Sequence, residues 1–307
     1  MPLEKEIELT KIAAKSGLYG VSIAEHVGLS SNDVFASASI LSQHSSQMTL
    51  IANSVNQYTR HPIALAMAAH TVAAANGGRF ILGLGTGADD SLKKMRIGDT
   101  KPLSRLKETI QITRALLQGK EVSYNGRYFS LEPTRIQTEE KYEIPIYVPA
   151  IRDKAISFAS KYGNGIFLSN CSSINFVQYV CDLLSENRTS TNFAIAGALT
   201  HIPTADRKQG LWSAKMVITR YLSIPGIGET LLKRSGLDPS IAMKIRTGQT
   251  SVSDEIAEMM CVVGGTSALE KRLENFRSAG VSLLIVSSPT DQIESTRRLG
   301  DLKTSFD

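Results

Sequence analysis

Glu25 and His26 are the side chains of this chain with the clearest capacity for chemistry, and they are neighbours in the segment VSIAEH. The segment reads as a short buried strand, and adjacent side chains on a strand point to opposite faces. One of the two should therefore face a central pocket, and we assign that place to His26. A histidine there can position a ligand as a hydrogen-bond donor or can move a proton, and we favour the first role. The alternative is a structural histidine whose bonds are all made within the fold.

Two further predicted strands end in small or polar residues. Asn53, Ser54 and Val55 interrupt the buried run LIANSVNQ, which indicates a bulge that could press main chain against a flat ring. An ordinary helix N-cap region is the alternative interpretation. Thr86 and Gly87 close the segment GRFILGLGTG, whose alternating glycines allow the main chain to approach a ligand closely. The two strand ends together predict a cofactor that is held mainly by main chain.

Several common chemistries lack their residue patterns here. GLGTGADD carries no Lys-Ser/Thr pair after its last glycine, and its glycine spacing differs from the dinucleotide fingerprint. No Gly-x-Ser-x-Gly elbow supports a serine hydrolase. His44, His70 and His201 lie in separate elements without acidic residues at ligand spacing, so we expect no metal. The chemistry is therefore expected to come from a bound cofactor.

Short apolar strands alternate with helical patterns, which is typical of repeated βα units and a parallel sheet. Barrels of such units collect functional residues at the carboxyl ends of their strands. The seven strands that we predict are Gly20–Ala24, Thr49–Ser54, Arg79–Gly83, Ile144–Pro149, Gly165–Ser169, Phe193–Thr200 and Ser282–Val286. A closed barrel needs eight, and the chain opens with a helical pattern where a strand is expected. We predict an α/β fold of the TIM (β/α)8 type that lacks its first strand, either because that strand lies upstream or because the barrel is open along one seam.

The length favours one domain over residues 1–307, with insertions at about 89–143 and 203–264. The first insertion holds an amphipathic helix at Leu103–Gln118 and a hairpin in which Asn125-Gly126 predicts a two-residue turn. The second is mostly helical. Insertions of this size cap a substrate pocket or serve as a purely structural cover.

A helix should begin at Pro62, because proline suits the first helical position. Arg60 and His61 stand directly before it. We therefore expect them to cap the helix and tether the preceding loop, and we do not assign them to catalysis.

Composition and charge favour an intracellular enzyme. The net charge of +5 is spread along the chain, and no basic block or aromatic-interleaved stripe predicts a nucleic-acid partner. Cys171, Cys181 and Cys261 form no C-x-x-C pair, which argues against a disulfide framework and indicates a reducing compartment. The sequence shows no signal-peptide core and no apolar run long enough to span a bilayer. A cytoplasmic location without membrane binding is expected.

The chain resembles the bacterial-luciferase-like flavin and deazaflavin oxidoreductases, and within them the methylenetetrahydromethanopterin reductases that use coenzyme F420. The resemblance covers nearly the whole chain and rests on the EH of SIAEH, on NQYTRHP, on GGRFILGLGTG, on RLKETIQITRALLQGKEVSYNGRYF, and on the C-terminal run from DEIAEMM to RRLGDL. It implies a luciferase-like barrel, a homodimer and a bound F420, with FMN as the alternative cofactor.

The resemblance also implies roles for individual residues. It places Glu25 and His26 beside the polar edge of the deazaflavin. It places Ser54 and Val55 at a bulge, often with a non-proline cis bond, that supports one face of the ring. It assigns Thr86 and Gly87 to the ring or ribityl chain, and Ala150, Ser169, Asn170 and Cys171 to the tail and phosphate. Asn53 is also a predicted cofactor-binding residue.

The implied reaction is hydride transfer from reduced F420 to a pterin-type C1 carrier, as in a 5,10-methylenetetrahydromethanopterin reductase. The protein would mainly orient two flat partners face to face. Two other functions remain open: an FMN-dependent monooxygenase of the same barrel class, and a barrel that binds flavin or a partner protein without turnover.

Overall fold

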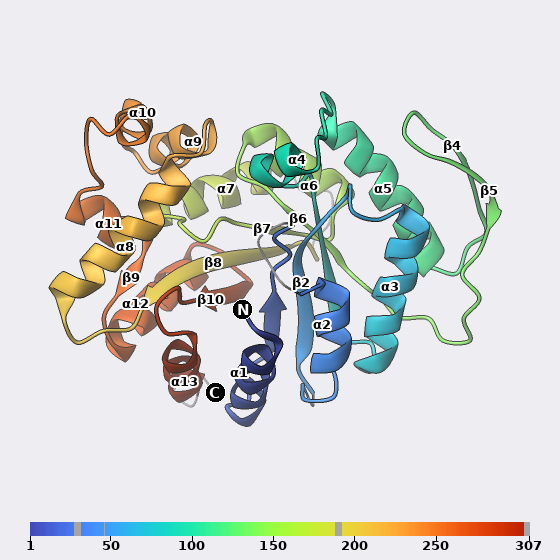
Figure 1. Cartoon of the computed structure of the whole chain (residues 1–307), viewed down its shortest axis with the longest axis horizontal. Helices are drawn as coiled ribbons and strands as arrows, with labels where there is room; N and C mark the ends of the chain where they lie inside the picture. The colour runs from blue at the N-terminus through green and yellow to red at the C-terminus, as the bar shows by residue number, and fades with distance from the viewer. Residues whose placement is uncertain (28–31, 46, 188–191, 304–307) are drawn as a thin grey trace. The chain divides into compact units, whose positions relative to one another are not determined.

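A computed structural model describes residues 1–27, 32–45, 47–187 and 192–303. Its contacts divide the chain into two compact units (Figure 1). The first comprises Met1–Pro149 and Tyr162–Asn164, and the second comprises Ala150–Lys161 and Gly165–Asp307. The prediction that residues 1–307 form one domain stays a prediction.

A parallel sheet forms the centre of the first unit. Its strands are β1 (Gly20–Ile23), β2 (Thr49–Asn56), β3 (Phe80–Gly85) and β6 (Ile146–Pro149), hydrogen-bonded in this order. All six residues of β3 are buried, as expected for a parallel strand covered on both faces. The carboxyl ends of these strands therefore meet at one edge, where the sequence places its polar residues.

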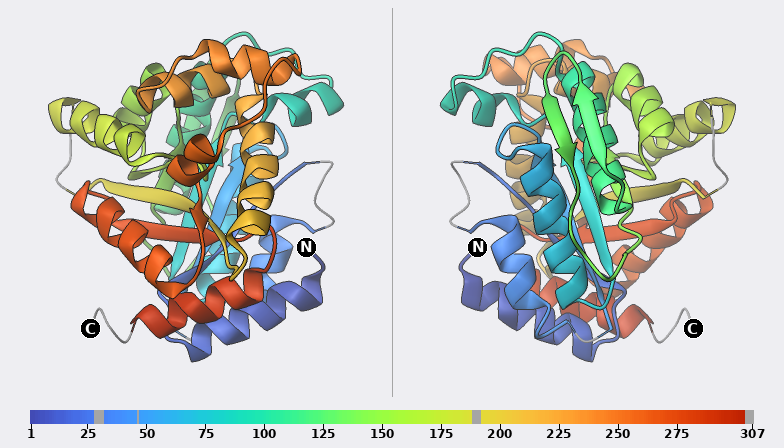
Figure 2. Two further views of the ribbon diagram at one scale, coloured as in Figure 1. Left: turned by 90° about the vertical axis from the view of Figure 1, so that its left-hand side faces the viewer. Right: turned by 90° about the vertical axis from the view of Figure 1, so that its right-hand side faces the viewer.

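Helices and one hairpin surround this sheet. The helices are α1 (Leu3–Lys15), α2 (Val34–Leu41), α3 (Pro62–Ala75), α4 (Asp89–Lys94) and α5 (Pro102–Leu117), and the hairpin is β4 (Val122–Asn125) with β5 (Ser130–Thr134). Helix α3 packs against β3 and α5, and the hairpin lies beside α5 (Figure 2). Helix α3 begins at Pro62 as predicted, and the imidazole of His61 accepts a hydrogen bond from the N–H of Ile63 at 3.3 Å.

The second unit also contains a parallel sheet, formed by β7 (Gly165–Phe167), β8 (Ala194–Ile202) and β10 (Leu283–Ser287). A short strand, β9 (Val262–Val263), pairs with the end of β8. The helices of this unit are α6 (Asp153–Tyr162), α7 (Ile174–Asn187), α8 (Arg207–Leu222), α9 (Ile227–Arg234), α10 (Ser240–Arg246), α11 (Asp254–Met260), α12 (Thr266–Ser278) and α13 (Gln292–Lys303).

All seven predicted strands are confirmed, with ends that differ by up to two residues, and β9 is the strand that the sequence did not reveal. A two-residue strand gives no alternating pattern, which explains the omission. The insertion at 203–264 is mostly helical as predicted, since it contains α8 to α11.

The predicted two-residue turn at Asn125-Gly126 is wrong. Asn125 pairs with Ser130, so the connection is four residues long, and the N–H of Gly126 donates to the carbonyl of Phe129. The carboxylate of Glu108 on α5 accepts hydrogen bonds from the N–H groups of Arg127, Tyr128 and Phe129 at 2.9–3.2 Å. This contact with a distant side chain outweighs the local turn preference.

Candidate active site at the ends of β2 and β3

The end of β2 contains the expected bulge. Its register with β3 shifts between Ala52 and Val55, and the Asn53–Ser54 peptide bond is cis. Beyond the bulge, Asn56 pairs with Gly85 of β3, and the N–H of Gln57 donates to the Gly85 carbonyl at 3.1 Å. The structure therefore brings Asn53, Ser54 and Val55 next to the segment that continues into Thr86 and Gly87.

Side chains of the protein pack closely against the glycines at the end of β3. A Cβ on Gly85 would lie 2.8 Å from Cγ of Pro149 and 3.1 Å from Oγ of Ser54. A Cβ on Gly87, whose φ is +80°, would lie 2.5 Å from Nδ2 of Asn56. At both positions a neighbouring side chain occupies the space that a Cβ would take, and the predicted approach of a ligand to this main chain stays a prediction. The missing side chains therefore allow Ser54, Pro149 and Asn56 to pack against the strand.

Glu25 connects the end of β1 to the bulge. Its side chain is only 8% exposed, and its Oε2 accepts a hydrogen bond from the N–H of Asn56 at 2.8 Å. Its Oε1 lies 2.7 Å from Nη1 of Arg60. Both carboxylate oxygens are thus engaged within the fold, and the predicted contact of Glu25 with a cofactor ring stays a prediction.

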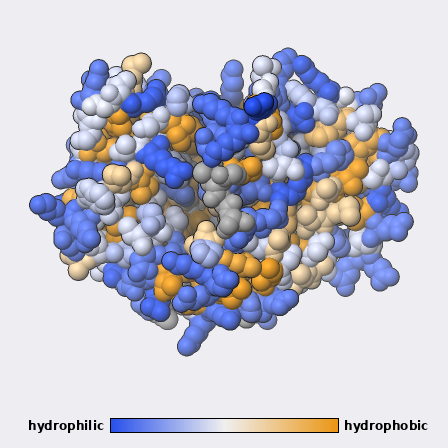
Figure 3. Space-filling view, in the orientation of Figure 1, coloured by the Kyte–Doolittle hydropathy of each residue, from blue (hydrophilic) through white to orange (hydrophobic). Residues whose placement is uncertain are grey.

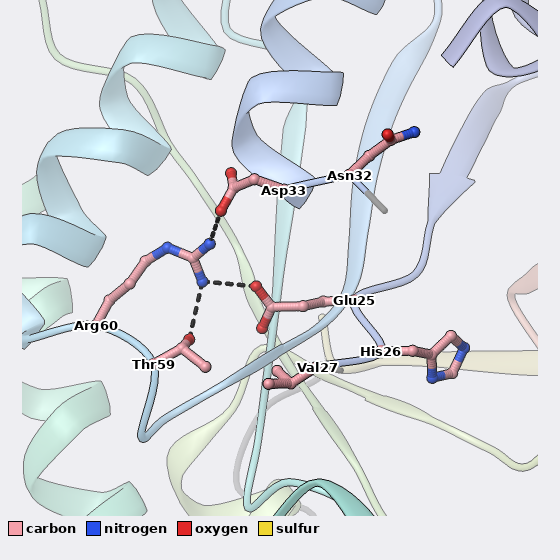
Figure 4. Close-up of a pocket in the computed structure, with 7 residues that line it drawn as sticks. All are labelled: Glu25, His26, Val27, Asn32, Asp33, Thr59 and Arg60. Atoms are coloured by element: carbon pink, nitrogen blue, oxygen red, sulfur yellow. Dashed lines mark hydrogen bonds and ion pairs between the residues drawn. The ribbon is translucent and has the colours of Figure 1, made fainter. Parts of the chain in front are cut away.

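Arg60 is the centre of a charged cluster in which it contacts both Glu25 and Asp33 (Figure 4). Its guanidinium also lies over the ring of Phe35, 4.9 Å from the centroid. Asp33 caps α2 by accepting from the N–H groups of Phe35 and Ala36. Burial raises the pKa of Asp33, but the bonds from the backbone and Arg60 outweigh that effect and lower the pKa overall. The predicted tethering role of Arg60 is confirmed.

His26 points away from this cluster, on the side opposite to Glu25 (Figure 4). The predicted divergence of the two neighbouring side chains is confirmed, and His26 is exposed. A cavity of about 440 Å³ lies beside these residues and is lined by Glu25, His26, Val27, Asn32, Asp33, Thr59 and Arg60. Glu25, which lines this cavity, also accepts the hydrogen bond from the N–H of Asn56 at the end of β2.

Tyr58, Asp99 and Arg105 attach the first insertion to the loop after β2. The hydroxyl of Tyr58 donates to Oδ2 of Asp99 at 2.7 Å, and the guanidinium of Arg105 lies over the rings of Tyr58, Tyr128 and Phe129 at 4.8–5.3 Å. Burial and the negative charge of Asp99 raise the pKa of Tyr58, so its hydroxyl stays protonated. This contact could not be predicted from the sequence, because Tyr58 and Asp99 are 41 residues apart.

The predicted tail-binding residues belong to the second unit. Ala150 is buried and donates its N–H to the carbonyl of Phe167 on β7. After β7, the N–H of Cys171 donates to Oγ of Ser169 at 3.4 Å, and Nδ2 of Asn170 donates to the hydroxyl of Tyr221 at 3.2 Å. These bonds compete with the predicted binding of an anion by this loop. The roles of Ala150, Ser169, Asn170 and Cys171 stay predictions.

Cys171 is fully buried, and a hydrogen bond with Cys261 together with burial raises the pKa of its thiol well above the usual value. It is therefore a poor nucleophile and a poor metal ligand. Within the residues that the structure describes, no group of three or more His, Cys, Asp or Glu side chains is arranged to hold a metal ion.

The chain matches the model of the luciferase-like monooxygenase family over residues 1–283. It belongs to this family. The family resemblance and the barrel fold class expected from the sequence are both confirmed, the fold by its similarity to solved structures. The F420-dependent tetrahydromethanopterin reductase of Methanopyrus kandleri superposes with a TM-score of 0.82 at 20% identity, covering 98% of this chain and 94% of that one.

Curated relatives agree with this membership in the luciferase-like family. A 5,10-methylenetetrahydromethanopterin reductase of Archaeoglobus fulgidus is 24% identical, with 94% of this chain and 92% of the relative covered. The enzyme of the same name from Methanolobus tindarius is 23% identical over 94% and 91%. An F420-dependent secondary alcohol dehydrogenase, solved with an F420-acetone adduct, superposes with a TM-score of 0.81 at 16% identity. No helix among the residues described is both long and apolar enough to cross a bilayer.

Proposed function

We propose that this protein is an F420-dependent oxidoreductase that acts on a C1 carrier in the manner of a 5,10-methylenetetrahydromethanopterin reductase. The observation that carries the proposal is the similarity along more than nine-tenths of the chain to reductases of that name.

The residues at the ends of β2 and β3 fit a flat, uncharged ring. The bulge at Asn53–Val55 presents main chain, and the amide Nδ2 of Asn56 is buried beside Gly87 without a hydrogen-bond partner among the described residues. An uncharged donor of this kind suits a ring that carries carbonyl oxygens. In this proposal Asn53, Ser54, Val55, Thr86 and Gly87 hold the ring.

When bound, F420 supplies a hydride from a carbon centre. The protein's own contribution is to fix the orientation of the ring and to keep water from the reacting face. His26 follows β1 on the side opposite to Glu25, and we propose that it donates a hydrogen bond to a ring or substrate atom as a positioning group.

The cofactor assignment predicts that F420 binds the apo protein more tightly than FMN does. Purified protein is titrated with each oxidised cofactor, and the quenching of cofactor fluorescence gives the two dissociation constants. Cofactor that copurifies with the protein is identified by absorbance and mass. Tighter binding of FMN, together with oxygen consumption in the presence of reduced FMN, would favour a monooxygenase and contradict the proposal.

The substrate assignment is tested by supplying reduced F420 with either methylenetetrahydromethanopterin or a simple ketone. We expect oxidation of F420 with the C1 carrier alone. Turnover of the ketone alone would contradict the substrate assignment and would identify the protein as a carbonyl reductase of the same family.

We also propose that the protein is a cytoplasmic homodimer that associates through the exposed faces of α2 and α3. These helices carry no Asp, Glu, Lys or Arg, and their exposed residues are Ala36, Ile40, Ala64, Met67, Thr71, Ala74 and Ala75. Helices α2 and α3 pack together, and an apolar area lies over them in Figure 3. A charge-free face on two neighbouring helices is the kind of surface that a second copy of the chain can cover.

Replacement of Met67, which is 54% exposed on α3, by lysine should convert the dimer to a monomer. The molar mass in solution is measured by light scattering after gel filtration. Met243→Lys serves as the control, because Met243 is similarly exposed at 61% on α10 of the second unit. A wild-type protein with the mass of one chain, or a dimer that persists in Met67→Lys, refutes this interface.

A further inference from the structure

Asn56 is almost completely buried, and its amide orientation follows from its neighbours. Its side chain is held at the end of β2 with 5% of the residue exposed. Oδ1 accepts a hydrogen bond from the N–H of Tyr58 at 3.0 Å. Because an N–H group can only donate, the oxygen of the amide must face Tyr58, and Nδ2 must therefore lie on the other side.

The Nδ2 donor on that other side is unsatisfied. Among the described residues, this buried nitrogen has no hydrogen-bond partner. It lies against Gly87, at 2.5 Å from the position that a Cβ on Gly87 would take. A buried donor without an acceptor costs about 1–3 kcal/mol, so native structures rarely keep one without a purpose. An acceptor from outside the chain is the simplest explanation.

The charges around Asn56 indicate which acceptor fits. The carboxylate of Glu25 accepts from the main-chain N–H of Asn56, and Arg60 is shared between Glu25 and Asp33. Two carboxylates thus face one guanidinium, and this cluster disfavours a further anion such as a phosphate nearby. The acceptor that remains suitable is a neutral carbonyl oxygen.

We propose that Nδ2 of Asn56 donates a hydrogen bond to a carbonyl oxygen of the ligand bound at Gly87. This inference rests on the proposed function, because it takes the ends of β2 and β3 as the place of the ring. A carbonyl oxygen occurs both on the deazaflavin ring and on the pterin of a C1 carrier. Asn56 was not among the site residues predicted from the sequence, although it follows the predicted bulge directly.

Asn56→Asp separates a ligand-binding role from a structural one. Aspartate keeps an oxygen for the N–H of Tyr58 but replaces the donor by a negatively charged acceptor. If Asn56 only caps this loop, the added carboxylate beside Glu25 lowers the thermal midpoint but leaves the ligand affinity of the folded protein unchanged. If it binds a carbonyl oxygen, the affinity falls at least tenfold. Asn56→Ser removes the amide donor without adding charge and should also lower the ligand affinity. It serves as the test variant if Asn56→Asp does not fold.

The experiment measures three quantities for each variant: the dissociation constant of oxidised F420 with apo protein, the KM for the C1 carrier, and the thermal midpoint of the apo protein. Asn125→Asp, the same change at an exposed hairpin residue, is the control. We expect a weaker F420 affinity in both Asn56 variants and an unchanged affinity in the control. A rise confined to the KM also supports the inference and identifies the substrate as the source of the carbonyl.

Failure of the inference and failure of the proposed function give different results. If wild-type protein binds FMN in place of F420, the proposed function fails, and the same comparison of variants is made with FMN, whose ring also carries carbonyl oxygens. Unchanged affinity for whichever cofactor binds, together with an unchanged KM, overturns the inference and leaves Asn56 as a loop cap.

Discussion

Replacement of Glu25 by glutamine is expected to lower the free energy of unfolding by about 2–4 kcal/mol, because it removes one partner of a buried ion pair. The side chains of Glu25 and Arg60 are only 8% and 17% exposed. Glutamine can still accept from the N–H of Asn56, but it leaves the guanidinium of Arg60 with Asp33 as its remaining carboxylate partner. The expected loss is therefore below that of a fully isolated buried charge.

The measurement is urea denaturation of the apo protein at pH 7, compared with the same type of change at an exposed pair. Asp90 contacts Lys94 one helical turn away at 3.1 Å, and its side chain is 66% exposed. Asp90→Asn should change the free energy of unfolding by less than about 0.5 kcal/mol. If the two variants lose equal stability, the buried ion pair of Glu25 with Arg60 does not stabilise the fold more than an exposed pair does.

The strands of this protein were predictable because buried parallel strands read as continuous apolar runs. The segment that becomes β3 is the clearest case, since every residue from Phe80 to Gly85 is buried. The bulge was also visible, because Asn53 and Ser54 interrupt such a run with polar residues. Both the buried strand and the bulge can be predicted from neighbouring residues in the sequence, without knowledge of distant contacts.

The partners of the site residues were not predictable in the same way. The carboxylate of Glu25 reaches Arg60 and Asn56, which are more than thirty residues away in the sequence. Likewise, the packing of Ser54 against Gly85 and of Asn56 against Gly87 could not be predicted from the sequence. Such contacts depend on how strands are placed beside each other, and spacing along the chain does not specify them.

The second large effect is expected at His201, whose replacement by alanine should cost about 2–4 kcal/mol of stability. His201 is fully buried at the end of β8. Its Nε2 lies 3.1 Å from the carbonyl of Gly264, and its Nδ1 lies 2.9 Å from Oγ of Ser295 on α13. Because a carbonyl only accepts, Nε2 carries the proton of the neutral ring and Nδ1 accepts from the serine hydroxyl. Alanine leaves both polar partners buried without a bond.

His201 should also make stability depend on pH in the mildly acidic range. Burial lowers its pKa most strongly, and the positive charge of Arg298 lowers it further, while the Gly264 carbonyl and Glu294 act in the opposite direction. The unfolded chain therefore binds a proton at a higher pH than the folded chain does. Stability is then lost as the pH falls below the ordinary histidine value of about 6.5, by at most about 1.4 kcal/mol per pH unit.

To isolate the contribution of His201, the free energy of unfolding is measured from pH 8 to pH 5 for wild type, His201→Gln and His44→Gln. Glutamine at position 201 keeps an amide that can donate to the Gly264 carbonyl but does not titrate, so the curve of His201→Gln should be flatter than that of wild type below pH 6.5. His44→Gln, the control, makes the same substitution at a half-buried histidine outside β8 and α13. Parallel curves for wild type and His201→Gln would show that His201 is protonated equally easily in the folded and unfolded chains, and that its burial between β8 and α13 has no electrostatic cost.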